Sequence, residues 1–382
     1  KGLMKLSKIN SIIFTSLFFN NFLYCMQDNK SNENITLEII KTYNNAAETL
    51  SCDDGIVYTT QANYINIWDK SGNSLGVITT DLEAIQAIDI TAAGNIAVTG
   101  NSGHVQVYDS QTKQKIYDIA ATEDVYMNLK EYSPNIIWGN AMGNSMNIID
   151  TRQNSVVATW QGPARDIYSA GVAAIPEKNT LVSSHYGNIW FWDSRKSWAP
   201  IHIYDLPYGV HQEVIIDDKK LLVPGGPESG DIQIKTFDKE FCLPDSYYEG
   251  WAPSLTVELS QDKIYVLSGD TQGRLCIWHK DKRYAAAATM AEAYYTPMLN
   301  IIPLSEKYVL TTQGWYGNGF ISIWDISDLN FIQSMCHVPI SSIAYIVMTS
   351  SNTFATVDFS NNLRFWNWLW PINSQPLNCI LL

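Results

Sequence analysis

The segment GNIWFWD, residues 187–193, is a turn-forming glycine followed by a short apolar and aromatic strand that ends in aspartate. This pattern predicts the second half of a β-hairpin, because glycine readily adopts the left-handed backbone conformation of tight turns. Comparable segments recur along the chain and can be aligned on the position of Trp192. The eight anchors, 40 to 46 residues apart, are Trp68, Tyr108, Ile149, Trp192, Lys235, Trp278, Trp324 and Trp366. The segment is therefore one copy of a repeated unit.

A second regularity supports this alignment. Five residues before each anchor stands a residue type that favours left-handed turns, namely Asn63, Gly103, Asn144, Gly187, Gly230, Gly273, Gly319 or Asn361. Each anchor strand thus follows a turn and another strand, and further apolar segments on both sides complete four short strands per unit. A ring of such units leaves only short, protected strand edges. The sequence therefore predicts an all-β fold, a closed β-propeller of four-stranded antiparallel blades.

Eight anchors predict eight blades, with a seven-bladed ring plus an appended unit as the alternative. Residues 34–43 or residues 367–382 could supply the outer strand of the last blade. The anchor tryptophans are expected to fill the gaps between adjacent blades. The residues assigned to the structural repeat are Trp68, Trp192, Trp278, Trp324 and Trp366 together with Gly103, Gly187, Gly230, Gly273 and Gly319.

The clearest repeats read NYINIWD, GNIWFWD, GRLCIWH and NGFISIWD. They resemble the repeats of WD-repeat β-propellers, and the resemblance extends from about residue 36 to residue 382. Two family features are absent: the aspartate that usually precedes the turn residue, and the Gly-His pair that usually opens a repeat. The resemblance implies a rigid, non-catalytic scaffold that binds other proteins or peptides on the propeller faces.

The composition disfavours some classes of partner. The chain has 382 residues, with 25 Lys and Arg against 38 Asp and Glu, and a net charge of −13. This acidic balance argues against nucleic-acid binding. The cysteines form no Cys-x-x-Cys pair and the histidines lack the spacing of metal ligands, so we expect no metal site and no cofactor. A monomeric propeller is expected.

The N-terminal residues differ from the rest of the chain. Within residues 1–27, a short basic stretch precedes an apolar run, as in a secretory signal peptide or an N-terminal anchor. Asn20 and Asn21 interrupt the run, which disfavours a transmembrane helix. A polar linker over residues 28–35 leads to the propeller, residues 36–382. We expect secretion or a location in the cell envelope or the endoplasmic reticulum lumen, with membrane contact only if the leader is uncleaved. A cytoplasmic location is the alternative.

Residues that the repetition does not explain are candidates for binding a partner. Two consecutive repeats carry Asp-x-Arg after the anchor, and several aromatic residues fall at predicted loops or strand ends, where they could act as binding anchors. The candidates are Asp150, Arg152, Trp190, Asp193, Arg195, Trp251, Trp315, Tyr316, Trp368 and Trp370. No nucleophile elbow, phosphate-binding loop or paired-carboxylate motif is present, so no catalytic residue is assigned.

Two other functions and one modification match parts of the sequence. Residues 192–195, WDSR, resemble the box of substrate receptors of cullin-RING ubiquitin ligases, in which the arginine faces the adaptor. Residues 108–118 are faintly similar to the blades of secreted eight-bladed quinoprotein dehydrogenases. The C-terminal CILL matches a prenylation box on Cys379, but no basic residue follows Arg364 to supply a second membrane signal. Lipidation at Cys379 is therefore disfavoured.

Overall fold

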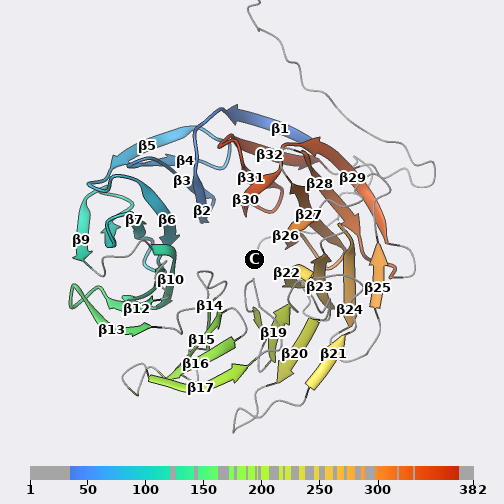
Figure 1. Cartoon of the computed structure of the whole chain (residues 1–382). Coiled ribbons are helices and arrows are strands. Elements are labelled where there is room, and N and C mark those ends of the chain that lie inside the picture. The colour runs from blue at the N-terminus through green and yellow to red at the C-terminus, as the bar shows by residue number, and fades with distance from the viewer. Residues whose placement is uncertain are drawn as a thin grey trace, which may run out of the picture.

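In the computed structural model, every regular element among the described residues is a β-strand. The structure describes residues 35–120, 126–141, 145–161, 172–175, 179–185, 188–193, 196, 199–205, 215–217, 220–224, 232–236, 245–248, 254–260, 265–270, 273–279, 285–288, 297–315, 318–329 and 332–369. The strands form eight four-stranded sheets around a common centre (Figure 1). Within these residues, no helix has the length and apolar character needed to cross a membrane.

Sheets 1 to 4 are each built from consecutive strands. Sheet 1 contains β2 (Thr49–Asp53), β3 (Ile56–Gln61), β4 (Tyr64–Trp68) and β5 (Ser74–Thr79). Sheet 2 contains β6 (Ile85–Ile90), β7 (Ile96–Gly100), β8 (His104–Tyr108) and β9 (Lys115–Ala120). Sheet 3 contains β10 (Tyr126–Ser133), β11 (Ile136–Ala141), β12 (Ser145–Asp150) and β13 (Ser155–Gln161). Sheet 4 contains β14 (Val172–Ile175), β15 (Thr180–His185), β16 (Asn188–Asp193) and β17 (Ala199–Asp205).

Sheets 5 to 7 repeat this order, and sheet 8 departs from it. Sheet 5 contains β18 (Ile215–Asp217), β19 (Lys220–Pro224), β20 (Ile232–Thr236) and β21 (Asp245–Tyr248). Sheet 6 contains β22 (Ser254–Leu259), β23 (Tyr265–Asp270), β24 (Leu275–His279) and β25 (Ala285–Ala288). Sheet 7 contains β26 (Met298–Pro303), β27 (Tyr308–Trp315), β28 (Asn318–Asp325) and β29 (Gln333–Ile340). Sheet 8 contains β30 (Ile343–Met348), β31 (Thr353–Asp358), β32 (Leu363–Leu369) and the N-terminal strand β1 (Thr36–Tyr43).

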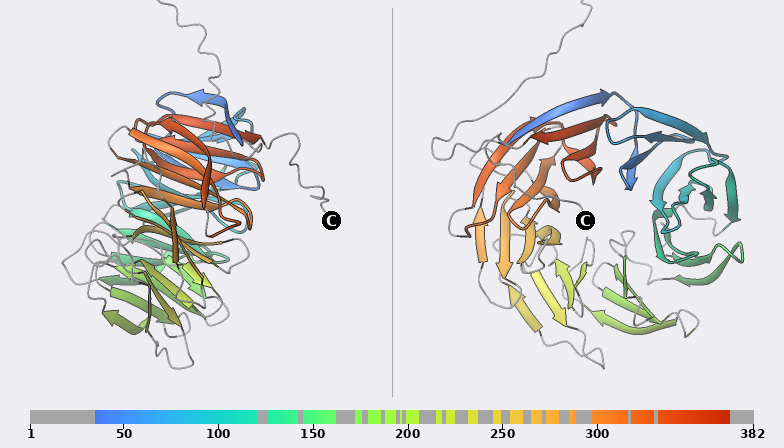
Figure 2. Two further views of the ribbon diagram at one scale, coloured as in Figure 1. Left: turned by 90° about the vertical axis from the view of Figure 1, so that its right-hand side faces the viewer. Right: turned by 180° about the vertical axis from the view of Figure 1, so that it is seen from behind.

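Sheet 8 joins the two ends of the described chain. β1 pairs antiparallel with β32, so that Thr36 lies opposite Leu369 and Tyr43 opposite Leu363. Of the two segments that the sequence offered for the outer strand of the last unit, the N-terminal one takes this place. The innermost strand of each sheet contacts that of the next, and β30 contacts β2. Figure 2 shows the same arrangement from the side and from behind.

Apolar side chains from neighbouring sheets meet in the gaps between the sheets. Along β7, Ile96 and Val98 pack in a cluster with sheet 1, whereas Ala97 packs in a cluster with sheet 3. This division arises because successive strand residues point to opposite faces of a sheet. Both faces of β7 are therefore covered, and the strand is buried along its whole length.

Four anchor tryptophans are buried and bonded within their own sheets. The indole N–H donates to a hydroxyl on the preceding strand, from Trp68 to Thr59 (3.0 Å), Trp192 to Ser183 (2.9 Å), Trp324 to Thr311 (2.8 Å) and Trp366 to Thr356 (2.9 Å). Each bond satisfies a donor that would otherwise be buried at a cost. Trp278 lies in β24, but its side chain is outside the described part of the structure.

Some of the predicted turn residues have the expected left-handed backbone conformation and others do not. Left-handed φ angles are found at Gly103 (69°), Gly273 (76°) and Asn361 (61°). In the first hairpin, Ala62 has the positive φ of 50° that was predicted for Asn63, so the turn lies one residue earlier. The left-handed prediction is also wrong for Gly319, which has no positive φ. Glycine is required there because a Cβ would lie 2.8 Å from the Cα of Ser342.

A β-bulge recurs in the outer strand beside the anchor. In six sheets, the outer strand has one extra residue between the partner of the anchor and the partner of the residue before the anchor. These unpaired residues are Ile40, Leu75, Ile116, Val157, Ile201 and Met335. All six are large and apolar. Bulges redirect side chains at sheet edges, and Ile116, which is 40% exposed, borders the pocket described below.

Candidate partner-binding face

In four sheets an aspartate ends the third strand or directly follows it, and its side chain caps the turn that leads to the fourth strand. Their Oδ1 atoms accept a hydrogen bond from the backbone N–H two residues later, with distances of 2.9 Å for Asp69, 2.9 Å for Asp109, 3.0 Å for Asp150 and 2.9 Å for Asp325. Such Asx-turns fix the local backbone. These four turns join the third and fourth strands of sheets 1, 2, 3 and 7, and we name the end of the sheets at which they lie the Asp-turn face.

Asp150 and Arg152 form an ion pair within one of these turns. Arg152 donates from Nε to Oδ1 (2.9 Å) and from Nη2 to Oδ2 (2.7 Å), and Gln153 Nε2 donates to Oδ2 (3.0 Å). The hydrogen bonds from Arg152 lower the pKa of Asp150 to about 2. Asp150 is buried, whereas the Arg152 side chain is 62% exposed. A partner could therefore contact Arg152 but not the carboxylate.

Trp190 and Asp193, two further candidates, are buried. The rings of Trp190 and Trp192 stack with centroids 5.7 Å apart and an interplanar angle of 17°. Both rings belong to a core cluster that also contains Trp138 from sheet 3. Trp190, a partner-binding candidate in the sequence, is therefore a core residue, because its side chain packs against sheet 3.

Trp368 also lies in the core. Its side chain is only 2% exposed and packs against Phe354, with ring centroids 6.2 Å apart. The sequence suggested a loop beyond the last anchor, but β32 extends to Leu369 because β1 pairs along its whole length. Trp368 is thus a core residue and not an exposed partner anchor.

The remaining candidates are not located by the described structure. Trp315 ends β27 opposite Asn318, and its side chain is outside the described part. The other predicted residues outside the described ranges are Arg195, Trp251, Tyr316, Trp370, Cys379, Gly187, Gly230 and Asn144. The leader and linker predictions for residues 1–34 lie outside these ranges too.

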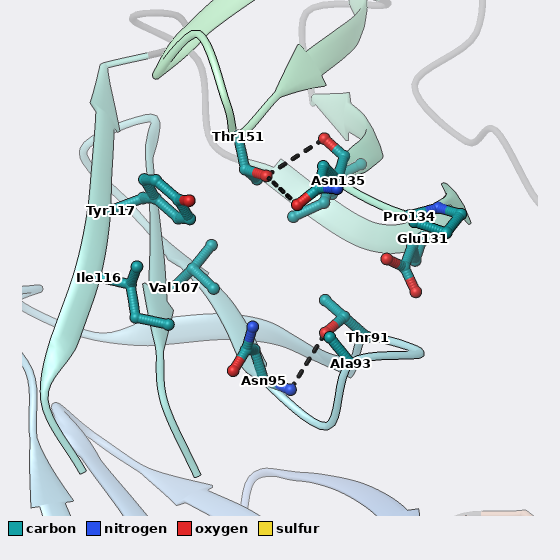
Figure 3. A pocket seen from close by; sticks show the side chains of 11 residues that line it. Thr91, Ala93, Asn95, Val107, Ile116, Tyr117, Glu131, Pro134, Asn135 and Thr151 are labelled. Atoms are coloured by element: carbon teal, nitrogen blue, oxygen red, sulfur yellow. Dashed lines mark hydrogen bonds between the residues drawn. The ribbon is translucent and has the colours of Figure 1, made fainter. Parts of the chain in front are cut away.

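A pocket opens between sheets 2 and 3 on the Asp-turn face. It has a volume of about 130 Å³, and its lining residues are Thr91, Ala93, Asn95, Val107, Ile116, Tyr117, Glu131, Pro134, Asn135, Ile137 and Thr151. Figure 3 shows Ile116 and Tyr117 on one side and Glu131 and Pro134 on the other. We name it the sheet 2–3 pocket. It adjoins the Asp150 turn, since Thr151 is part of its wall.

Hydrogen bonds across the boundary hold the two walls of this pocket together. Asp89 of β6 accepts bonds from Lys130 Nζ (3.0 Å) and from the backbone N–H of Glu131 (3.0 Å). Glu131 in turn accepts a bond from the backbone N–H of Ala92. These reciprocal contacts place the Glu131 carboxylate at the pocket wall. Sequence reasoning missed this site because its residues come from separate repeats and form no local motif.

Neither the protein-family models nor the curated proteins include a match to this chain. Solved structures do resemble it. The computationally designed Ika8 protein has a TM-score of 0.64 at 16% identity, covering 86% of this chain and 98% of its own. A chain of the mitotic checkpoint complex has a TM-score of 0.58 at 14% identity, covering 92% and 97%. BamB from Moraxella catarrhalis has a TM-score of 0.66 at 10% identity, covering 87% and 99%.

The chain has the β-propeller fold. At these identities the similarities establish the fold alone, since one fold serves many functions. The predicted all-β class and four-stranded antiparallel sheets are confirmed.

Proposed function

We propose that this chain is a divergent WD-repeat propeller that acts as a non-catalytic scaffold for binding other proteins or peptides. The proposal depends mainly on the Asp-turn face, where four turns are fixed by their own carboxylates and the Asp150 turn adjoins a small open pocket. A rigid surface of this kind loses little conformational entropy when a partner binds.

Two further observations support the proposal. The indole–hydroxyl bond of the anchor tryptophans recurs in four sheets, which is consistent with a repeat family that has diverged in sequence. One structural neighbour belongs to the mitotic checkpoint complex, a protein assembly. The first observation supports the repeat assignment, and the second supports a role in binding other proteins.

Affinity purification of the full chain from its native cells, followed by cross-linking and mass spectrometry, tests the proposal. We expect a partner in stoichiometric amount, cross-linked to lysines on the Asp-turn face such as Lys70 or Lys113. Recovery of the chain without any stoichiometric partner would refute the scaffold function. Adding a quinone cofactor with calcium and measuring the bound chromophore tests the enzymatic alternative, for which stoichiometric uptake would be the diagnostic result.

A further inference from the structure

We propose that the sheet 2–3 pocket binds the side chain of a lysine supplied by a partner protein. This inference depends on the proposed scaffold function and specifies the chemistry of one contact. It follows from the size of the pocket, from its lining, and from what occupies the matching position at the preceding sheet boundary.

The size of the pocket fits a single side chain. Its volume is about 130 Å³, whereas pockets for drug-sized molecules or cofactors measure about 300–1,000 Å³. Access is open, because Pro134 and Asn135 are exposed at its rim along with Ile116. A side chain extending from a bound polypeptide could therefore enter from the Asp-turn face.

The lining combines an apolar wall with one carboxylate. Val107, Ile116 and Ile137 offer aliphatic surface, and Glu131 contributes the charge. A lysine matches both features, since its methylene stem packs on apolar surface while its ammonium group stays polar. A purely apolar occupant would instead remove water from Glu131 without replacing its hydrogen bonds, which is unfavourable.

The charges around the pocket favour a cation over an anion. Among the described residues, Lys130 is paired with Asp89 and Arg152 with Asp150, whereas Glu131 has no ion pair. Its one described hydrogen bond comes from the backbone of Ala92. The carboxylate thus retains capacity to accept bonds from an incoming ammonium group.

A lysine of the chain itself occupies the matching position between sheets 1 and 2. Lys113, in the third-to-fourth turn of sheet 2, donates from Nζ to the carbonyl oxygen of Leu75, the bulge residue of β5 (3.1 Å). The adjacent Gly76 leaves room, since a Cβ there would lie 2.0 Å from this Nζ.

At the next boundary the chain does not provide this lysine. Ile116 is the bulge residue equivalent to Leu75, and Tyr117 stands where Gly76 stands in sheet 1. In the turn of sheet 3, Asn154 takes the place of Lys113, four residues after the turn aspartate and with a similarly positive φ. The shorter Asn154 side chain is exposed and does not line the pocket, so the chain supplies no counterpart of Lys113 there.

Binding of short peptides to the full chain tests the inference. The probes are four peptides of sequence Gly-Ser-Ala-X-Ala-Ser-Gly in which X is lysine, arginine, acetyl-lysine or norleucine, and the measurement is thermophoresis. We expect the lysine peptide to bind about tenfold more tightly than the norleucine or acetyl-lysine peptide, as one charge-assisted contact provides. Equal binding of all four peptides, or no binding of the lysine peptide, would overturn the inference. Preference for the arginine peptide would overturn the assignment of lysine.

Variants of the chain separate this site from general electrostatic attraction. Glu131→Gln keeps an oxygen that can accept the hydrogen bond from Ala92, and it should weaken lysine-peptide binding about tenfold. The control, Glu83→Gln, makes the same charge change at an exposed position outside the pocket and should change the affinity for the lysine peptide by less than about twofold. Equal weakening by both variants would overturn the inference.

A third variant fills the pocket from within. Asn154→Lys should abolish binding of the lysine peptide without lowering the melting temperature, and Asn154→Gln is its matched control. A natural partner that still co-purifies with Asn154→Lys at unchanged affinity would overturn the lysine contact and leave the scaffold function intact. Absence of any partner for the unaltered chain would instead refute the scaffold function.

Discussion

Replacing Asp358 with asparagine is expected to lower the free energy of unfolding by about 3–5 kcal/mol, the cost of breaking a buried ion pair. Asp358 ends β31, and its side chain is fully buried. Its Oδ1 accepts bonds from the backbone N–H of Ser360 (2.9 Å) and of Asn362 (3.0 Å). Its Oδ2 accepts bonds from Asn362 Nδ2 (3.0 Å) and Arg364 Nη1 (2.7 Å). The carboxylate therefore organises the whole β31–β32 turn.

The asparagine variant retains the shape of the side chain and the Oδ1 acceptor. Its amide nitrogen, however, replaces Oδ2 and faces two donors, Asn362 Nδ2 and Arg364 Nη1. The variant also leaves Arg364, whose side chain is only 15% exposed, without its counter-ion. Both effects act in the interior, where unpaired polar groups are costly, so the loss exceeds that of an exposed ion pair.

Urea unfolding followed by far-ultraviolet circular dichroism measures this loss as a lower midpoint at an unchanged slope. The double variant Asp358→Asn/Arg364→Met removes the stranded charge and should be more stable than Asp358→Asn alone. A midpoint for Asp358→Asn within about 0.5 kcal/mol of the unaltered chain would refute the reasoning, since surface changes have effects of that size.

The pH dependence provides a second measure of the same carboxylate. Burial alone would raise the pKa of Asp358, but hydrogen bonds from Asn362 and Arg364 outweigh burial and lower it. A lowered folded-state pKa means that the stabilisation is complete above the unfolded value of about 3.9 and is lost as the pH falls below it. Asp358→Asn should therefore show a smaller loss of stability on acidification than the unaltered chain.

Three further substitutions test other parts of the structure. Thr311→Val leaves the indole N–H of Trp324 without its acceptor and should cost about 1–3 kcal/mol in urea unfolding, more than Thr311→Ser; equal losses would contradict this. Gly319→Ala brings a Cβ within 2.8 Å of the Ser342 Cα and should cost about 1–3 kcal/mol by calorimetry, and an unchanged melting temperature would disprove the steric argument. Asp150→Asn removes a carboxylate whose pKa is about 2, and it should lower the free energy of unfolding by about 1 kcal/mol at neutral pH after solvent screening. The variant should also lose less stability between about pH 4 and pH 2 than the unaltered chain. An unchanged dependence of stability on acid pH would count against the ion pair.

The repeated unit could be read from the sequence because its signals are local. Turn residues and anchor strands recur at a regular spacing, and even Lys235, which replaces an aromatic anchor, lies in the third strand of a sheet, β20. The roles of individual tryptophans were less accessible. Trp190 was a partner-binding candidate because the repeat pattern did not explain it, and Trp368 because it fell at a predicted loop or strand end. In the structure the adjacent sheet covers Trp190, and core side chains such as Phe354 cover Trp368.

The sequence by itself determined the strand order within each unit and the all-β class, because hydrophobic alternation and turn chemistry act over a few neighbouring residues. Only the tertiary structure decided that β1 completes the last sheet and that a pocket opens between sheets 2 and 3. Both depend on contacts between distant residues. Asn154 is the counterpart, in the turn of sheet 3, of the Lys113 that spans the preceding boundary, and this difference matters only once neighbouring sheets are packed together.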